Sequence, residues 1–271
     1  MVSIEAADFS FVRDLVFARS AIVLGDDKHY LIESRLAPLA REFGFGTLGG
    51  IIRELRTKAD SPLAERVVEA LTTNETSWFR DIRPFEALRE VIVPALIRAR
   101  SADRRLSIWS AACSTGQEIY TVAMILEDFP ELASWRVDLL GTDLNTEVLE
   151  RARSARFSAL EVNRGLPAHY LARHFTPDGT QFQLVDAIRR RVRFEKLNLS
   201  AHWPALPPFD VILMRNVLIY FDTETKRRIL EAAHRQLTNH GYLMLGAAES
   251  TLGIVSTFTP VQVGGTVVYQ R

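Results

Sequence analysis

The sequence is poor in cysteine, in net charge and in long apolar runs. The single cysteine, Cys113, excludes a disulfide within the chain, and the six scattered histidines form no group with the spacing of a zinc site. Lysine plus arginine and aspartate plus glutamate number 33 each, so no overall field draws the protein toward nucleic acid or anionic lipid. We therefore expect no bound metal and no nucleic-acid partner.

No uncharged apolar run approaches the roughly 20 residues that a membrane span needs, and the first residues do not resemble a signal peptide. We therefore expect a cytoplasmic protein without direct membrane insertion. The 271 residues are 47% apolar, which suffices for the core of one large or two modest domains.

A strand, a tight loop and a helix start are predicted for residues 106–120. Ile108 and Trp109 suit a buried strand, and the apolar residues from Tyr120 onward suit a helix face. The loop between them, Ser110–Gly116, has little side-chain bulk, so a ligand can approach its backbone closely. The first N–H groups of a helix lack intrahelical partners and suit a carboxylate or phosphate, although an ordinary turn explains the pattern equally well.

Residues 1–72 have the pattern of a small helical domain. Apolar residues recur at helical spacing in 9–16 and 32–40, and Ser61-Pro62 begins a last amphipathic helix. The mixed charges of this part fit a solvated surface better than a charged docking face.

A polar run, Thr72–Ser77, follows the helical part. A linker or a helix cap explains these side chains, because they satisfy orphan N–H groups. Neither explains Arg80, which stands beside Trp78 and Phe79. A helix is then predicted from Arg83 to Pro94.

Strands alternate with helices in the rest of the chain, which predicts a mostly parallel sheet with a terminal hairpin. Such sheets bind ligands beyond the carboxyl ends of their strands, where an acid after the second strand commonly accepts hydrogen bonds from ribose hydroxyls. Asp143 either has that role or is an ordinary helix cap. Four polar residues are expected at this edge: Ser114, Asp143, Asn198 and Asn216.

Residues 156–191 interrupt the alternation. Alternating apolar residues flank a turn signal in Phe175–Leu184, which predicts a small antiparallel insertion. Four arginines between 189 and 193 form a basic run that is either a solvated face or a contact for an acidic partner.

Four blocks together resemble the CheR-type chemotaxis receptor methyltransferases. They are Thr73–Asp81 (TNETSWFRD), Ser110–Tyr120 (SAACSTGQEIY), Thr142–Leu149 (TDLNTEVL) and Phe209–Asp222 (FDVILMRNVLIYFD). With the helical leader they cover nearly the whole chain, and their order makes the combination far more specific than any one block. The chain departs from the family in Ala247-Ala248-Glu249, where a Gly-His-Ser-Glu run is common.

The resemblance implies an α/β fold with a Rossmann-like S-adenosylmethionine-dependent methyltransferase sheet. It places an N-terminal all-helical domain at 1–72 and the S-adenosylmethionine-binding domain at 73–271, with a small β subdomain at 170–195.

The resemblance also implies site residues and a reaction. Cofactor contacts are expected from Asn74, Thr76, Arg80, Glu118, Asp143, Asn198, Leu199, Arg215 and Asn216. Arg80 and Tyr220 resemble the family's residues nearest the reacting methyl group. The implied reaction moves a methyl group from S-adenosylmethionine to receptor glutamates and leaves S-adenosylhomocysteine, by positioning and without a metal.

The implied partner is the cytoplasmic domain of a methyl-accepting chemotaxis receptor. Some family members also bind a receptor's C-terminal peptide along an edge strand of the small β subdomain, which is physically reasonable. Two alternatives from other classes stay open: a methyltransferase for small carboxylic acids, and a noncatalytic sensor of S-adenosylmethionine.

Overall fold

The computed structural model describes residues 4–271, which divide into two compact units. The smaller unit holds the residues up to Thr73 together with Tyr220–Thr225, and the larger unit holds Asn74–Ile219 and Lys226–Arg271. The smaller unit contains α1 (Ala6–Ser20), η1 (Asp26–Lys28), α2 (His29–Glu42), α3 (Leu48–Thr57) and α4 (Pro62–Ala70).

Apolar periodicity explains the helices of the smaller unit. Phe9, Val12 and Val16 lie on one face of α1 and are buried. The start of α4 follows from a cap, because the Ser61 hydroxyl accepts the N–H of Ala64 at 3.3 Å.

The segment Tyr220–Thr225 belongs to this smaller unit through backbone contacts. Ile22 and Phe221 form an isolated antiparallel bridge, and the N–H of Val23 donates to the Tyr220 carbonyl at 2.9 Å. Phe221 is buried. The helical unit is therefore completed by residues that lie about 150 positions later in the sequence.

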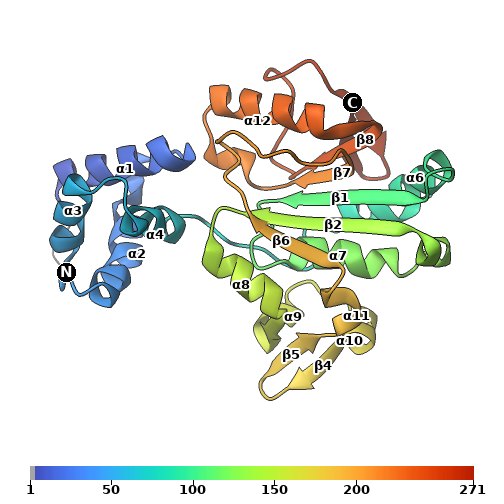
Figure 1. The fold of residues 1–271 in the computed structure, drawn as a ribbon, viewed down its shortest axis with the longest axis horizontal. Helices are drawn as coiled ribbons and strands as arrows, with labels where there is room; N and C mark the ends of the chain where they lie inside the picture. The colour runs from blue at the N-terminus through green and yellow to red at the C-terminus, as the bar shows by residue number, and fades with distance from the viewer. Residues whose placement is uncertain (1–3) are drawn as a thin grey trace. The chain divides into compact units, whose positions relative to one another are not determined.

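The larger unit is built on a seven-stranded sheet, described within residues 4–271, in the order β6-β2-β1-β7-β8-β10-β9 (Figure 1). The strands are β1 (Arg105–Ala111), β2 (Arg136–Asp143), β6 (Val192–Lys196), β7 (Phe209–Met214), β8 (Leu237–Leu245), β9 (Thr259–Val263) and β10 (Thr266–Gln270). The first five strands of that order pair in parallel, and the β9–β10 hairpin adds antiparallel strands beside β8. The predicted fold class is confirmed.

Helices precede the first strand of this sheet and connect the later ones. They are α5 (Arg83–Ala87), η2 (Leu88–Ile92), α6 (Val93–Ala99), α7 (Gln117–Leu126), η3 (Pro130–Ser134), α8 (Thr146–Ser154), η4 (Leu218–Tyr220) and α12 (Thr223–Gln236). α7 contacts β1, β2 and β6, and nearly all its residues are buried. Gly141 lets the layers meet there, because a Cβ on it would lie 2.7 Å from the Phe194 ring and 3.0 Å from Cys113 Sγ.

The interruption predicted after residue 156 is a second sheet of three antiparallel strands, in the order β3-β5-β4. It consists of β3 (Arg156–Ser158), β4 (Phe175–Asp178) and β5 (Gln181–Leu184), with α9 (Ala159–Asn163), α10 (Ala168–His174) and α11 (Asp186–Arg189) beside them. The range 170–195 therefore differs from the structure at both ends. It omits β3, and it includes most of β6, which pairs with β2 in the large sheet.

Candidate functional site

The predicted site residues of the larger unit follow the carboxyl ends of neighbouring parallel strands. β1 ends at Ala111, β2 at Asp143 and β7 at Met214, and the strand order changes direction between β1 and β7. In sheets of this kind the crevice at such a change of direction binds ligands.

The loop between β1 and α7 has a strained backbone. Ala112 and Ser114 adopt left-handed conformations with φ of 59° and 52°, and Gly116 follows with φ of 93°. Non-glycine residues rarely adopt this conformation, and such strain gathers at functional sites. Three residues of the loop after β1 therefore lie in the left-handed region.

Asp143 fixes this loop through backbone hydrogen bonds. One carboxylate oxygen accepts the N–H of Ser114 at 2.8 Å, and the other accepts the N–H of Asn145 at 3.0 Å. The Asn145 side chain in turn caps α8, because it accepts the N–H groups of Glu147 and Val148. Asp143 is thus a positioned carboxylate and not the helix cap that was its alternative reading; Asn145 is the cap.

The buried charge of Asp143 affects the thiol of Cys113. Burial raises the pKa of Cys113 well above its usual value, and the charges of Asp143 and Glu118 raise it further. The thiol therefore stays protonated at neutral pH, so it is neither a nucleophile nor a metal ligand in this state.

Arg215, directly after β7, is the buried centre of a polar cluster. Its Nη1 donates to Glu118 Oε2 at 3.0 Å, and its Nη2 donates to Asp81 Oδ2 and to the Arg80 carbonyl, each at 2.7 Å. The side chain of Arg215 is 1% exposed, and its guanidinium lies 5.2 Å from the centre of the Phe85 ring. Arg215 therefore joins three chain segments that are far apart in sequence.

Glu118 ties this cluster to the sheet. Its second carboxylate oxygen accepts the hydroxyl of Ser110 at 2.8 Å, near the end of β1. The side chain of Glu118 is 12% exposed, so its charge is compensated by Arg215 and by that hydroxyl more than by water.

Arg80 stands in a tight turn whose neighbouring residues have strained backbones. Phe79, Asp81 and Ile82 all have positive φ, between 46° and 68°. The guanidinium of Arg80 donates to the Glu75 carbonyl at 3.0 Å and is partly exposed. Arg215 holds the backbone of Arg80 through its carbonyl, while the Arg80 guanidinium stays accessible to a ligand.

The segment before this turn reaches the β1–α7 loop. The Ser114 hydroxyl donates to the Asn74 carbonyl at 2.7 Å, and Thr76 lies two residues further along, half-buried. Asn74 and Thr76 therefore belong to a segment that the strained loop holds in place.

Asn198 and Leu199 follow β6. The N–H of Leu197 donates to the Asp143 carbonyl at 2.9 Å, which joins this segment to the end of β2. The Asn198 side chain accepts the N–H and the hydroxyl of Ser200, and Leu199 is buried. These contacts place Asn198 at the same sheet edge as Asp143.

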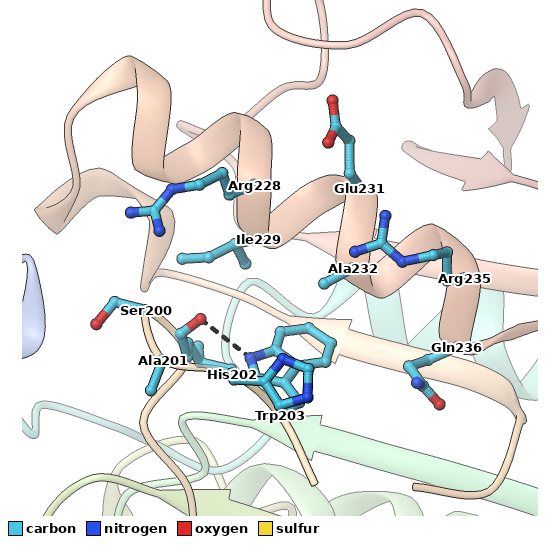
Figure 2. Close-up of a pocket in the computed structure, with 11 residues that line it drawn as sticks. Ser200, Ala201, His202, Trp203, Arg228, Ile229, Glu231, Ala232, Arg235 and Gln236 are labelled. Atoms are coloured by element: carbon cyan, nitrogen blue, oxygen red, sulfur yellow. Dashed lines mark hydrogen bonds between the residues drawn. The ribbon is translucent and has the colours of Figure 1, made fainter. Parts of the chain in front are cut away.

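A pocket of about 410 Å³ opens beside Leu199, between the loop after β6 and α12 (Figure 2). The Trp203 indole lies in it, and its N–H donates to the Leu199 carbonyl at 3.0 Å. Arg228 and Arg235 of α12 lie along the other side. The predicted cofactor segment thus borders an open pocket with two cations on its wall.

Asn216 has two unusual features. It is left-handed, with φ of 60°, and its Oδ1 atom is buried without a hydrogen-bond donor among the described residues. A buried polar atom without a partner is costly and calls for an explanation. A ligand N–H at this edge would supply one.

Tyr220, the second predicted catalytic residue, belongs to the smaller unit. It ends η4, and its carbonyl accepts the N–H of Val23. The other nine predicted site residues belong to the larger unit.

Sequence reasoning gave Glu249 no role, although its position after a strand at the same edge was a usable signal. Its carboxylate accepts N–H groups from Asn216, Leu218 and Gly246, each at 2.7 Å. Asp81 and Ser110, which bind Arg215 and Glu118, were likewise assigned no role.

The groups at this edge fit S-adenosylmethionine. Asn216 offers a buried acceptor without a donor, which suits an ammonium or amino N–H. A carboxylate such as Asp143 has about four lone-pair sites, so it can accept a hydroxyl in addition to its backbone donors. The small residues of the loop after β1 let a ligand approach its backbone closely.

No helix described in residues 4–271 is both long and apolar enough to cross a membrane.

Two family models match the chain. The all-alpha domain of the CheR methyltransferases matches residues 7–72, and the S-adenosylmethionine-binding domain of the same family matches residues 74–265. Chemotaxis protein methyltransferase 1 of Pseudomonas aeruginosa is 39% identical over 99% of each chain. Chemotaxis protein methyltransferase Cher2 of Pseudomonas putida is 37% identical over 97% of each chain, and a chemotaxis protein methyltransferase of Vibrio parahaemolyticus is 35% identical over 98% of this chain and 96% of its own.

Proposed function

The chain belongs to the CheR methyltransferase family, and we propose that it methylates glutamate side chains of chemotaxis receptors. It is an S-adenosylmethionine-dependent chemotaxis methyltransferase. The proposed step gives a glutamate methyl ester and S-adenosylhomocysteine. The observation that carries the proposal is the match to chemotaxis methyltransferases over both units of the chain.

We propose cofactor contacts from residues at the carboxyl edge of the large sheet and from the chain segments that are hydrogen-bonded to this edge. Asp143 accepts ribose hydroxyls, and Asn216 accepts an N–H at its buried Oδ1. Glu118 and Arg215 hold the Arg80 turn in place through the polar cluster. Asn74, Thr76, Asn198 and Leu199 complete the proposed set.

The chain needs no general base for this reaction. A glutamate side chain has an unperturbed pKa of about 4.3, so the acceptor is already ionised near neutral pH. When bound, S-adenosylmethionine supplies a methyl group on a positively charged sulfur. The protein's task is to align the carboxylate oxygen with that methyl carbon, and alignment can contribute roughly 7–11 kcal/mol.

We propose that Arg80 pairs with the substrate carboxylate or orders the cofactor pocket, and that Tyr220 donates an orienting hydrogen bond. The pairing must stay loose, because an interaction that stabilises the ground-state carboxylate more than the transition state slows attack. The partly exposed guanidinium of Arg80 meets this requirement better than the buried guanidinium of Arg215.

We propose the cytoplasmic domain of a methyl-accepting chemotaxis receptor as the partner. A receptor's C-terminal peptide is a further proposed ligand, added to an edge strand of the small sheet. β4 and β3 are the edge strands of this sheet. Pro177 in β4 has no N–H to offer, so a peptide beside β4 would find an interrupted ladder.

Incubation of the protein with methyl-labelled S-adenosylmethionine and candidate receptor cytoplasmic domains tests this function. We expect label on the receptor that alkali releases, as it does from esters. A protein that binds S-adenosylhomocysteine in calorimetry but labels no receptor would support the sensor alternative. Equal or faster labelling of free carboxylic acids would support the small-molecule alternative, which does not require the helical unit.

A further inference from the structure

We infer that Glu249 is a positioning residue that holds Asn216 ready for the cofactor. The inference rests on the proposed use of Asn216 as a cofactor contact. Glu249 follows β8, and Asn216 follows the neighbouring parallel strand β7, so the two lie at the same edge of the sheet. The two residues are 33 positions apart in sequence.

One carboxylate gathers four backbone N–H groups. Oε2 of Glu249 accepts from Asn216 and from Gly246, each at 2.7 Å, and Oε1 accepts from Leu218 at 2.7 Å and from Ile219 at 3.3 Å. Three of these donors lie between the end of β7 and the end of η4, and the fourth, Gly246, directly follows β8. The carboxylate therefore pins the loop after β7 to the strand beside it.

This loop needs such a restraint. Asn216 is left-handed, a conformation that few non-glycine residues adopt, although Asn adopts it more readily than most. Without Glu249, the N–H groups of Asn216, Leu218 and Ile219 would lose their carboxylate acceptor. An ionised acceptor bonds backbone N–H groups more strongly than a neutral one does. The hydrogen bonds of Glu249 thus stabilise the left-handed conformation of Asn216.

Gly246 lies in close contact with the clamp, as we call the Glu249 carboxylate together with the backbone N–H groups that it accepts. A Cβ at this position would lie 2.7 Å from Glu249 Oε2, and 2.8 Å from both the backbone nitrogen and the Nδ2 atom of Asn216. Contacts this short do not occur for real Cβ atoms, so any side chain would displace the carboxylate or Asn216. The contact between Glu249 and Asn216 therefore requires glycine at position 246.

The consequence concerns the buried Oδ1 of Asn216. This atom has no donor among the described residues, so its direction matters only to a ligand. S-adenosylmethionine carries N–H donors on its ammonium and its adenine amino group. If the clamp is released, the loop relaxes, the acceptor turns away, and the cofactor loses that hydrogen bond while the apolar core is unaffected.

Calorimetric titration of the full chain with S-adenosylhomocysteine tests this role, with Glu249→Ala and Glu249→Gln compared to the wild type. We expect Glu249→Ala to weaken binding by about tenfold or more, as expected for the loss of one good hydrogen bond. Glu249→Gln should be intermediate, because its amide keeps one acceptor oxygen for two of the four donors. Glu131→Ala, an exposed glutamate on η3, is the matched control and should bind as the wild type does.

Gly246→Ala should displace Glu249 or Asn216 by steric contact and should therefore also weaken the binding of S-adenosylhomocysteine. Gly49→Ala is its control, because a Cβ there would meet nothing closer than 3.6 Å. In methylation assays the Glu249 variants should raise KM for S-adenosylmethionine, with KM for the receptor unchanged. Folded Glu249→Ala protein with wild-type affinity would overturn the inference. Wild-type protein that binds S-adenosylhomocysteine but methylates no receptor would overturn the proposed function and leave the inference standing.

Discussion

Arg215 and Glu118 form an ion pair, 3.0 Å between Nη1 and Oε2, that is almost completely removed from solvent. The two residues come from the end of β7 and the start of α7, which are 97 positions apart. Removal of one partner from such a pair leaves an uncompensated buried charge, which commonly costs about 3–5 kcal/mol.

We therefore expect Arg215→Met to lower the free energy of unfolding by about 3–5 kcal/mol, and Arg215→Met with Glu118→Gln to cost less than the sum of the single changes. Urea denaturation of the four proteins measures this coupling. Arg193→Met removes an exposed pair with Glu195 and should cost at most about 1 kcal/mol. Additive effects at Arg215 and Glu118 would contradict the coupling.

Asp143→Asn should weaken S-adenosylhomocysteine binding by about tenfold or more while the protein stays folded. The amide keeps only one acceptor oxygen, so it cannot serve Ser114, Asn145 and a ribose hydroxyl together. Calorimetry measures the affinity. Asp138→Asn, in the same strand but partly exposed and paired with Arg105, is the control and should bind normally.

Arg80→Ala and Tyr220→Phe should each lower the methylation rate at saturating S-adenosylmethionine. Arg80 is proposed to pair with the substrate carboxylate or to order the cofactor pocket, and Tyr220 is proposed to donate an orienting hydrogen bond. With cofactor bound, the loss of either role should lower kcat. Single-turnover assays with a receptor cytoplasmic domain measure the effect. Rates equal to the wild type with cofactor bound would show that neither residue has the proposed role.

The small β subdomain should lose stability in mild acid through His174. Burial lowers the pKa of His174 below its usual 6.5, and the nearby Arg173 lowers it further. Its Nε2 is buried without a partner among the described residues. Because the folded pKa lies below the unfolded pKa, the contribution of neutral His174 to stability is fully present above about pH 6.5 and is lost as the pH falls through the lowered value.

Urea denaturation of the wild type and of His174→Gln at pH 7 and pH 5 checks this sign. The wild type should lose more stability between these two pH values than the variant does. Parallel losses in both proteins would mean that His174 does not carry the effect.

The sequence predicted the elements whose patterns are long and local. The alternation of strands and helices predicted the sheet, and the turn within Phe175–Leu184 predicted the β4–β5 hairpin. β3 was missed because three residues are too few to show an alternation. β8 begins at Leu237, and its polar residues Thr238–His240 show no strand alternation, while the register with β7 shifts there. The predicted boundary near residue 72 and the predicted site residues stay predictions.

The site was only partly visible in the sequence, for a physical reason. Asp143 and Asn216 could be placed at the sheet edge, because each follows a predicted strand. The bonds of Arg215 to Glu118 and Asp81, and those of Glu249 to the loop after β7, join segments brought together only by the fold. No local pattern reports such contacts. The family resemblance supplied the names of the residues but not their partners.

The return of Tyr220–Thr225 to the helical unit means that the protein cannot be divided by one cut. The chain passes from one unit to the other after residues 73, 219 and 225. A fragment beginning at Asn74 would therefore contain Tyr220–Thr225, with the apolar Phe221, but would lack the helices of the unit to which this segment belongs. A protease that nicks the chain near residue 73 should leave both pieces associated until denaturant is added. Swapping the helical unit between relatives would require exchanging two separate stretches of gene.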